Sequence, residues 1–534
     1  MGQDPYLASL LRVRHHASHW SISIRIPGTV MSRSQAPMWN QLIQLTFKSQ
    51  ISLQGQIREM LVAAILDGHI PVGVPLPSTR VLAQQLGVAR NTVALAYELL
   101  VNEGYLRTKS RSGHFVNADI LGGRPFPRPR PTATADAPPA ASWDARVRFP
   151  VSRQRNIVKP KDWQKYPYPF IYGQFDPAQV PVAGWRECAT QALSTIEVRG
   201  WAGDLIDGDD ALLVEQIQMR LLGRRGVWAA PDEILVTVGA QHALFLLATL
   251  LIGSATTVGV EDPGYPDARN IFASRTPSVV ALPLDPDGLA LSAGLDGCDY
   301  VYVTPSHQCP TNVTMPLARR EALLDWAVRR DRVLIEDDYE IELGFGGRAQ
   351  PALKSLDRSG RVLYVSSLSK TLAPGIRLGY VVASRDLIRE LRALRRLMLR
   401  HPAANNERSV GLFLAMGYHD ALLRRLKQTY AERAPAVAAA LARHLPDVAF
   451  RTVAGASSFW LRFPDGVDTR ALATAAERQG VLIEPGDVFF AADRPPRNYA
   501  RLGFASIATE RIDPGIAALA AAYAQATATH AAAR

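Results

Sequence analysis

A proline- and alanine-rich stretch, residues 118–150, divides this 534-residue chain into two parts of different character. Its sequence, ADILGGRPFPRPRPTATADAPPAASWDARVRFP, has no apolar period and is typical of a semi-extended linker. In polyproline form, at about 3 Å per residue, such a linker spans up to roughly 100 Å. We therefore expect separate domains on its two sides, which need not touch within one chain.

The part after the linker, residues 151–534, alternates apolar β-type runs with amphipathic helical segments. This alternation predicts one large α/β domain. The apolar share of the whole chain, 47%, is sufficient for a large core. No run reaches the roughly 18 uninterrupted apolar residues of a membrane span, so no membrane partner is expected.

The first residues, 1–45, have no sustained period and carry a cluster of arginines and histidines. We predict a poorly ordered extension, or translation from a start upstream of the true one at Met31 or Met38, in preference to a metal site. The start of the chain also lacks the pattern of a secretory signal. The cysteines lack metal-ligand spacing, so we predict no metal or disulfide and a reducing cytoplasm. They are Cys188, Cys298 and Cys309.

Positive charge is concentrated before and within the linker. Residues 1–150 carry a net charge of +8 out of +11 for the chain, and the remaining residues carry +3. A basic segment on a nearly neutral body favours a polyanionic partner, most commonly nucleic acid. A solubilising surface is the alternative that charge alone leaves open.

Residues 46–117 predict short helices followed by a hairpin. Ser78 opens an apolar-periodic stretch and is a good N-cap for a helix that ends at Leu86, and Gly87 permits a tight turn. A second helix is expected from about Arg90 to Asn102. Two strands are expected around a basic tip, at residues 105–108 and 114–116.

A helix, a glycine turn and a second helix with polar residues in its first turn form helix-turn-helix geometry. Arg90 and Asn91 are placed to reach base edges or phosphates, and Thr92 can donate to a phosphate. The basic hairpin tip can lie along the DNA backbone or a minor groove. The predicted DNA-binding residues are Ser78, Thr79, Arg80, Arg90, Asn91, Thr92, Lys109 and Arg111.

The stretches LPSTRVLAQQLGVARNTVALAYELLVNEGYL and SGHFV resemble the winged-helix DNA-binding domain of the GntR superfamily. The resemblance covers about residues 50–117 and implies double-stranded DNA as the partner. It departs at Ala89, where the family usually has a serine that can cap the recognition helix and touch a phosphate.

In residues 151–534, the apolar runs are followed by residues that could form an imine or bind a phosphate. Lys370 follows small hydroxyl residues in VLYVSSLSKTLAPGIRLGYVV. VLIEDDYEIEL begins as an apolar strand that ends in carboxylates and a tyrosine. Asp337 and Tyr339 stand there at positions i and i+2, so both side chains leave the same face of the strand end. ILVTVGAQHALFLLATLL predicts a strand, a Gly-Ala turn and a helix whose N-terminus can hold a phosphate. Tyr265 follows another strand in VGVEDPGYPDARN.

These segments resemble the fold-type I pyridoxal 5'-phosphate (PLP) enzymes of the aminotransferase class. The resemblance implies a mostly parallel central sheet with helices on both faces and a smaller C-terminal α/β subdomain. It implies that Lys370 forms the Schiff base and that Asp337 pairs with the pyridine nitrogen. For the rest of the cofactor it implies Tyr339 at the ring oxygen, Tyr265 over the ring, and Gly239, Ala240, Gln241, Ser367 and Arg377 at the phosphate. Arg501, in YARLGFA, matches the arginine for a substrate carboxylate.

One loop departs from this aminotransferase pattern. Many relatives carry an asparagine before a Pro-Thr-Gly turn, where this chain reads TPSHQCPTNVTM. Ser306 and His307 occupy that neighbourhood, and we predict that they contact the cofactor. Asn312 stands where glycine is usual, although asparagine also tolerates left-handed geometry. Cys309 is expected to be a packing residue.

The combination of the two domains resembles the MocR family of bacterial transcription regulators. The resemblance implies a cytoplasmic homodimer in which each DNA-binding domain reaches toward the other subunit's large domain. It also implies that a small amino-compound effector displaces Lys370, forms an external aldimine held by Arg501 or Arg377, and changes operator binding. A catalytically active aminotransferase with a DNA-binding extension is the alternative. A regulator for which PLP itself is the signal is a third reading.

Overall fold

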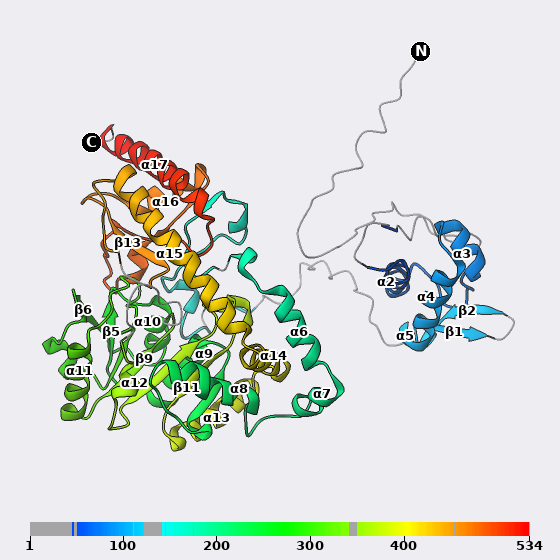
Figure 1. Ribbon diagram of the computed structural model, residues 1–534, viewed down its shortest axis with the longest axis horizontal. Helices are drawn as coiled ribbons and strands as arrows, with labels where there is room; N and C mark the ends of the chain where they lie inside the picture. The colour runs from blue at the N-terminus through cyan, green and yellow to red at the C-terminus, as the bar shows by residue number, and fades with distance from the viewer. Residues whose placement is uncertain are drawn as a thin grey trace, which may run out of the picture. The chain divides into compact units, whose positions relative to one another are not determined.

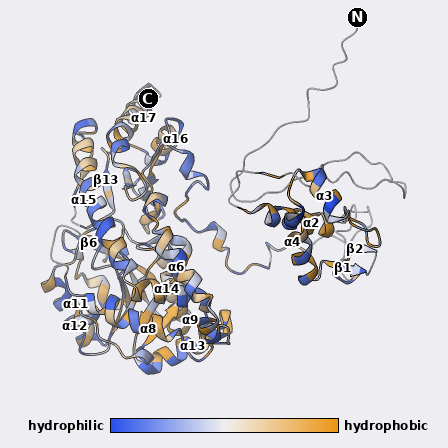
Figure 2. Ribbon diagram, turned by 45° about the vertical axis from the view of Figure 1, so that its right-hand side comes forward, coloured by the Kyte–Doolittle hydropathy of each residue, from blue (hydrophilic) through white to orange (hydrophobic). Residues whose placement is uncertain are grey.

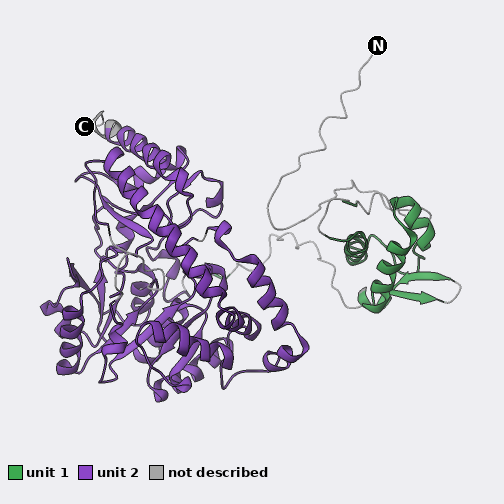
Figure 3. Ribbon diagram, viewed as in Figure 1, with its two compact units in different colours: residues 1–141 green, residues 142–534 purple. Residues whose placement is uncertain are grey.

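The chain forms two compact units, Met1–Ala141 and Ser142–Arg534, and the division falls within the stretch expected to be a linker (Figure 3). A computed structural model describes residues 45–46, 51–109, 112–121, 141–144, 146–174, 176–340, 350–452 and 455–532. All of the predicted extension except its last residue, most of the predicted linker and Arg111 lie outside the described residues.

The first unit consists of helices followed by a two-stranded hairpin. Its elements are α2 (Leu53–Leu66), α3 (Thr79–Leu86), α4 (Arg90–Asn102), β1 (Leu106–Lys109), β2 (Gly113–Val116) and α5 (Ala118–Leu121). The Ser78 hydroxyl caps α3 by accepting a hydrogen bond from the Val81 amide at 3.3 Å. Gly87 ends α3 in the left-handed region, with φ at 67°, and so turns the chain into α4.

This unit has a hydrophobic core of its own. Ile57 and Leu61 of α2 pack with Val93 and Leu100 of α4, and all four side chains have no exposed surface. The Tyr97 hydroxyl donates to the Pro77 carbonyl at 3.0 Å and ties α4 to the segment before α3. These contacts fix the angle at which α4 presents its first turn.

The second unit is built on an eight-stranded sheet with the order β4-β11-β10-β9-β8-β5-β6-β7 (Figure 1). The strands from β10 to β6 pair in parallel, whereas β11 and β7 are antiparallel to their neighbours. The bounds are β4 (Ile234–Thr237), β5 (Val258–Asp262), β6 (Val279–Asp285), β7 (Gly288–Leu289), β8 (Tyr300–Val303), β9 (Val333–Asp337), β10 (Val362–Ser367) and β11 (Gly379–Val382).

Helices cover both faces of this sheet. Leu363 and Val365 of β10 pack on one face, in a hydrophobic cluster with α9, α10 and α13. Val362 and Tyr364 point to the other face, where the clusters include residues of α8, α11 and α14. The alternation follows the two-residue period of a strand. Figure 2 shows hydrophobic residues gathered on α9. The helices before the C-terminal subdomain are α6 (Val182–Ala192), α7 (Thr195–Trp201), α8 (Ala211–Gln216), α9 (Ala240–Leu251), α10 (Pro266–Ala273), α11 (Leu317–Arg330), α12 (Leu353–Leu356), α13 (Arg385–Leu399) and α14 (Ala404–Ala415).

A smaller α/β subdomain completes the second unit. Its four-stranded antiparallel sheet has the order β12-β13-β16-β15, and β14 pairs with the early strand β3. Its elements are β3 (Tyr168–Pro169), α15 (Tyr418–His444), β12 (Ala449–Phe450), β13 (Ser458–Arg462), α16 (Thr469–Arg478), β14 (Val481–Leu482), β15 (Glu484–Pro485), β16 (Tyr499–Gly503) and α17 (Ile512–Ala532). The expected architecture, a winged helix-turn-helix followed by a mostly parallel α/β domain with a C-terminal subdomain, is confirmed.

Strand direction concentrates polar residues at one edge of the large sheet. Because parallel strands end at the same edge, Asp262, Asp337 and Ser367 at the ends of β5, β9 and β10 lie on one side. Ligands in open α/β sheets bind at this edge. Within the described ranges, no helix is both long and apolar enough to cross a membrane.

Candidate functional site

A cavity of about 420 Å³ in the large unit gathers most of the predicted cofactor residues. Strand ends and loops that are far apart in sequence supply its walls. The predicted residues that line it are Lys370, Asp337, Tyr339, Tyr265, Ala240, Gln241, Ser367, Arg377 and Arg501. Gly239, beside these, is the N-cap of α9.

Lys370 is a buried amine that loses its proton more readily than an ordinary lysine. Its Nζ lies 4.3 Å from the centre of the Tyr172 ring. Burial, followed by the positive charge of Lys159, lowers the pKa of Lys370 to about 8. The unprotonated amine is the form that attacks a carbonyl carbon, and a lowered pKa makes this form more abundant.

Asp337 presents an unsatisfied carboxylate oxygen. Its Oδ2 accepts a hydrogen bond from the Tyr302 hydroxyl at 2.8 Å, and its buried Oδ1 has no hydrogen-bond partner among the described residues. Burial raises the pKa of Asp337 to about 7. A protonated ring nitrogen would supply the missing donor, so this residue fits the pyridine ring of PLP. Asp338, between Asp337 and Tyr339, instead pairs with Arg225 at 2.7 Å.

Ser306 and His307 do not line this cavity, in contrast to what the sequence pattern suggested. The Ser306 hydroxyl accepts from Arg225 Nη2 at 3.1 Å and so joins the Arg225–Asp338 pair. His307 is 5% exposed, and neither ring nitrogen has a partner among the described residues. The same loop reaches the cavity two residues later, through Cys309, whose pKa burial raises to about 12.

The residues expected at the phosphate form a cradle. Gly239 has φ at 81° and precedes the first turn of α9, where backbone N–H groups are free to bind an anion. A Cβ at this position would lie 3.1 Å from Arg377 Nη2, which donates to the Val238 carbonyl at 3.0 Å. The hydroxyl of Ser369, another cavity residue, is buried without a partner among the described residues. These donors fit a phosphate group.

Arg501 lines the cavity from β16 of the C-terminal subdomain. It is 3% exposed, and its Nε donates to Glu484 Oε2 at 2.7 Å. The two residues are direct partners across the antiparallel pair of β15 and β16. The guanidinium lies 4.1 Å from the centre of the Tyr172 ring, so one ring contacts both Arg501 and Lys370.

Sequence reasoning missed several cavity residues. Ser369 sits beside Lys370 and could have been found from the hydroxyl-rich motif. Cys309 lies in the TPSHQCPTNVTM loop, where we expected it only to pack. The others come from strands and segments without a motif, so no local signal marked them. Five of the missed residues line the cavity: Tyr302, Ser369, Tyr172, Lys159 and Cys309. The sixth, Glu484, does not line it but forms ion pairs with Lys159 and Arg501.

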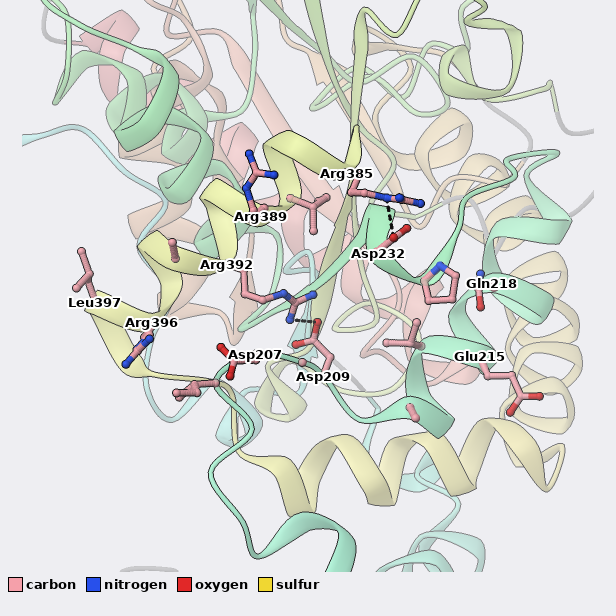
Figure 4. Close-up of a pocket in the computed structure, with 17 residues that line it drawn as sticks. Asp207, Asp209, Glu215, Gln218, Asp232, Arg385, Arg389, Arg392, Arg396 and Leu397 are labelled. Atoms are coloured by element: carbon pink, nitrogen blue, oxygen red, sulfur yellow. Dashed lines mark hydrogen bonds and ion pairs between the residues drawn. The ribbon is translucent and has the colours of Figure 1, made fainter.

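A larger cavity, of about 1230 Å³, lies elsewhere on the unit and lacks all of these residues (Figure 4). Arginines of α13 face acidic residues across it, and two of these arginines form ion pairs with acidic residues of the facing wall. Arg385 contacts Asp232 at 2.6 Å, and Arg392 contacts Asp209 at 2.8 Å. We therefore assign the cofactor to the smaller cavity, whose chemistry fits it. No group of three or more His, Cys, Asp or Glu residues within the described ranges is placed to hold a metal ion.

In the first unit, the residues predicted to contact DNA lie around the start of α4. Arg90 and Asn91 are exposed in its first turn, and Arg90 Nε donates to the Thr79 hydroxyl at 3.4 Å. Arg80 is exposed on α3, and Lys109 is exposed at the end of β1. The turn therefore brings residues of both helices together on one surface.

Comparisons with known proteins agree with this division. Residues 53–116 match the model of the bacterial regulatory proteins of the gntR family, and residues 206–519 match that of class I and II aminotransferases. The HTH-type transcriptional regulator TauR of Rhodobacter capsulatus is 43% identical over 475 residues, covering 89% of this chain and 97% of the relative. The probable rhizopine catabolism regulatory protein MocR of Rhizobium meliloti is 31% identical, covering 90% and 96%. The chain belongs to the MocR family.

The large unit of this MocR-family protein is similar to solved aminotransferases. LysN, an alpha-aminoadipate aminotransferase from Thermus thermophilus, is 27% identical with a TM-score of 0.66 and covers 73% of this chain and 100% of its own. The MocR-family protein is thus a transcriptional regulator with an aminotransferase-like domain that binds PLP.

Proposed function

We propose that this MocR-family regulator is a cytoplasmic homodimer that senses a small amino compound with an acidic group and changes its operator binding in response. The observation that carries the proposal is that one cavity holds the Lys370 amine, the unsatisfied Asp337 carboxylate and the Arg501 guanidinium. The same chain carries a helix-turn-helix with exposed basic residues.

Each cavity residue has a separate task. PLP, when bound, supplies an aldehyde that combines reversibly with amines. Lys370 would hold that aldehyde at rest, Asp337 would hold the ring nitrogen protonated, and Tyr265 would lie against the ring. Arg501, with its planar fork of donors, would bind the acidic group of the effector. Tyr339 would donate to the ring oxygen.

The segment that follows the linker supports a connection between the cavity and the DNA-binding unit. Asn156, Ile157 and Lys159 line the cavity. Gln154 donates to the Asn270 carbonyl at 3.2 Å, and the Asn270 amide donates to the Arg155 carbonyl at 3.0 Å, which anchors the segment on α10. A ligand that shifts this segment would act on the chain leading to the linker. Only a ligand with different affinity for two arrangements can change DNA affinity.

The test is fluorescence anisotropy of the PLP-loaded full chain on DNA from upstream of its own gene and on a shuffled duplex. We expect a preference of about 10³-fold or more at near-physiological salt, in the range of specific binders. Amines with and without a carboxylate or sulfonate are then added. We expect only acidic amines to change the affinity, and Lys370→Ala to abolish that response.

Three results would contradict this proposal. They are an unaltered response in Lys370→Ala, sustained turnover between an amino donor and a keto acid without sequence-preferring DNA binding, and an affinity that follows PLP occupancy without any amine. The second result would indicate an enzyme, and the third would indicate a sensor of PLP itself.

A further inference from the structure

Two amines and a guanidinium lie around one buried aromatic ring in the cofactor cavity. The Nζ atoms of Lys370 and Lys159 lie 4.3 Å and 6.0 Å from the centre of the Tyr172 ring, and the Arg501 guanidinium lies 4.1 Å from it. The face of an aromatic ring attracts cations, so Tyr172 offsets part of the cost of bringing like charges together. Lys370 and Arg501 have assigned roles, whereas Lys159 belongs to no motif.

Lys159 reaches the same stretch of backbone as Lys370, beside Gly173. Its Nζ donates to the Tyr172 carbonyl and lies 3.3 Å from Glu484 Oε1, with 23% of the side chain exposed. A Cβ on Gly173 would overlap the Nζ of Lys370 and lie 3.7 Å from that of Lys159. Gly173, with φ at +71°, therefore lets both amines approach the same stretch of backbone.

Burial lowers the pKa of Lys159 itself, and the neighbouring Glu484 carboxylate acts against that shift. Glu484 Oε1 faces Lys159, but its Oε2 accepts from Arg501, so one carboxylate serves two cations. Glu340 Oε2 accepts from the Tyr172 hydroxyl at 3.2 Å. The charged and titratable groups that act on Lys370 or respond to it are Lys159, Arg501, Asp337, Glu340, Glu484 and Cys309.

We propose that Lys159 is a positioning residue whose charge disfavours protonation of the Lys370 amine and so raises the share of its uncharged, nucleophilic form. The inference rests on the proposed role of Lys370 as the amine that holds the cofactor. Like charges disfavour the protonated form of a neighbouring lysine. After burial, Lys159 is the largest influence that lowers the pKa of Lys370, while Glu340 and Glu484 act in the opposite direction. Lys159 would therefore set how readily Lys370 exchanges with an amine effector.

The test measures the titration of Lys370 in the full chain freed of cofactor. Acetic anhydride labelling at a series of pH values, with mass spectrometry of the peptide that contains Lys370, gives the midpoint of its reactivity. We expect a midpoint near pH 8 for the native chain. In Lys159→Met the midpoint should rise by about one pH unit or more, since a like charge is removed from a buried site.

Two variants control for structure. Lys159→Arg retains the charge and should keep the native midpoint. Lys161→Met removes an exposed lysine of the same segment and should also leave the midpoint unchanged. A second measurement uses the PLP-loaded chain, in case the cofactor-free variant is unstable. The pH midpoint of its visible absorbance change should move upward in Lys159→Met and in neither control variant.

An unchanged Lys370 midpoint in Lys159→Met, by both labelling and absorbance, would overturn the inference. An equal shift in Lys159→Arg would also overturn it, because it would show that shape and not charge matters. Neither measurement uses an effector or DNA. Failure here would therefore leave the proposed effector response standing, and failure of that response would leave the titration result intact.

Discussion

Asp337 holds one carboxylate oxygen on the Tyr302 hydroxyl and leaves the other without a partner among the described residues. Asp337→Asn keeps the size of the side chain but removes the charge that would pair with a protonated ring nitrogen. We expect PLP affinity to fall about 10- to 100-fold, from the 1.5–3 kcal/mol of a hydrogen bond to a charged group. Equilibrium dialysis with absorbance detection measures this. Tyr302→Phe should cost less, and equal affinity in Asp337→Asn would contradict the assignment.

Glu407 provides a pH test of stability. It is 2% exposed, its Oε1 has no partner among the described residues, and burial together with Asp209 raises its pKa to about 8. The folded state thus binds this proton more tightly than the unfolded state. The stability that Glu407 contributes is present in full below its ordinary pKa and is lost as pH rises through about 8.

Glu407→Gln should remove this dependence. We expect the melting temperature to fall less between pH 5 and pH 9 in the variant than in the native chain. Thermal unfolding followed by circular dichroism measures the difference, with exposed Glu215→Gln as the control. A variant that loses as much stability with rising pH as the native chain would argue against a protonated Glu407.

At the scale of elements, the two helices of the helix-turn-helix differ in how they begin. The Ser78 hydroxyl caps α3, whereas Ala89 has the extended geometry of an N-cap before α4 but makes no side-chain cap. Ala89→Ser should therefore stabilise α4 by about 0.5–1 kcal/mol, the low end of measured cap contributions. Hydrogen exchange of the first-turn amides in the full chain should slow.

Ser78→Ala is the matched control, because it removes the side-chain N-cap that α3 already has. We expect faster exchange at the start of α3 in that variant. If exchange in α4 were unaffected by Ala89→Ser, the serine hydroxyl would not be accepting from the first-turn amides. DNA affinity should rise modestly in the serine variant, since the hydroxyl lies beside Arg90 and can also reach a phosphate.

At the scale of the whole molecule, each unit has a separate core. Leu100 has no exposed surface and belongs to the core cluster of the first unit. Leu100→Ala should destabilise the first unit by about 2–5 kcal/mol. We expect DNA binding to weaken strongly while the PLP absorbance of the large unit stays native.

The neighbouring Leu99→Ala is the control, because Leu99 is 38% exposed. It should leave both the DNA affinity and the absorbance close to native values. A loss of bound cofactor in Leu100→Ala would show that the two units fold as one cooperative body, contrary to their separate cores.

The sequence by itself determined the features that depend on neighbouring residues. Ser78 and Gly87 mark the start and end of α3 because a cap and a left-handed turn need only local geometry. The lysine motif, the aspartate two residues before a tyrosine and the Gly-Ala turn identified PLP, because each carries its chemistry on one short segment. Alternating strands and helices identified the α/β fold for the same reason.

Only the tertiary structure decided which distant segments share the cavity. The sequence placed Ser306 beside the cofactor, but the fold turns it to Arg225 and brings Cys309 to the cavity instead. Lys159 and Arg501 are separated by more than 300 residues and both contact Glu484, because β15 pairs with β16 and the early segment places Lys159 beside Glu484. Such contacts depend on the order of the strands and on how the subdomain folds against the large sheet. No local sequence pattern predicts either of these.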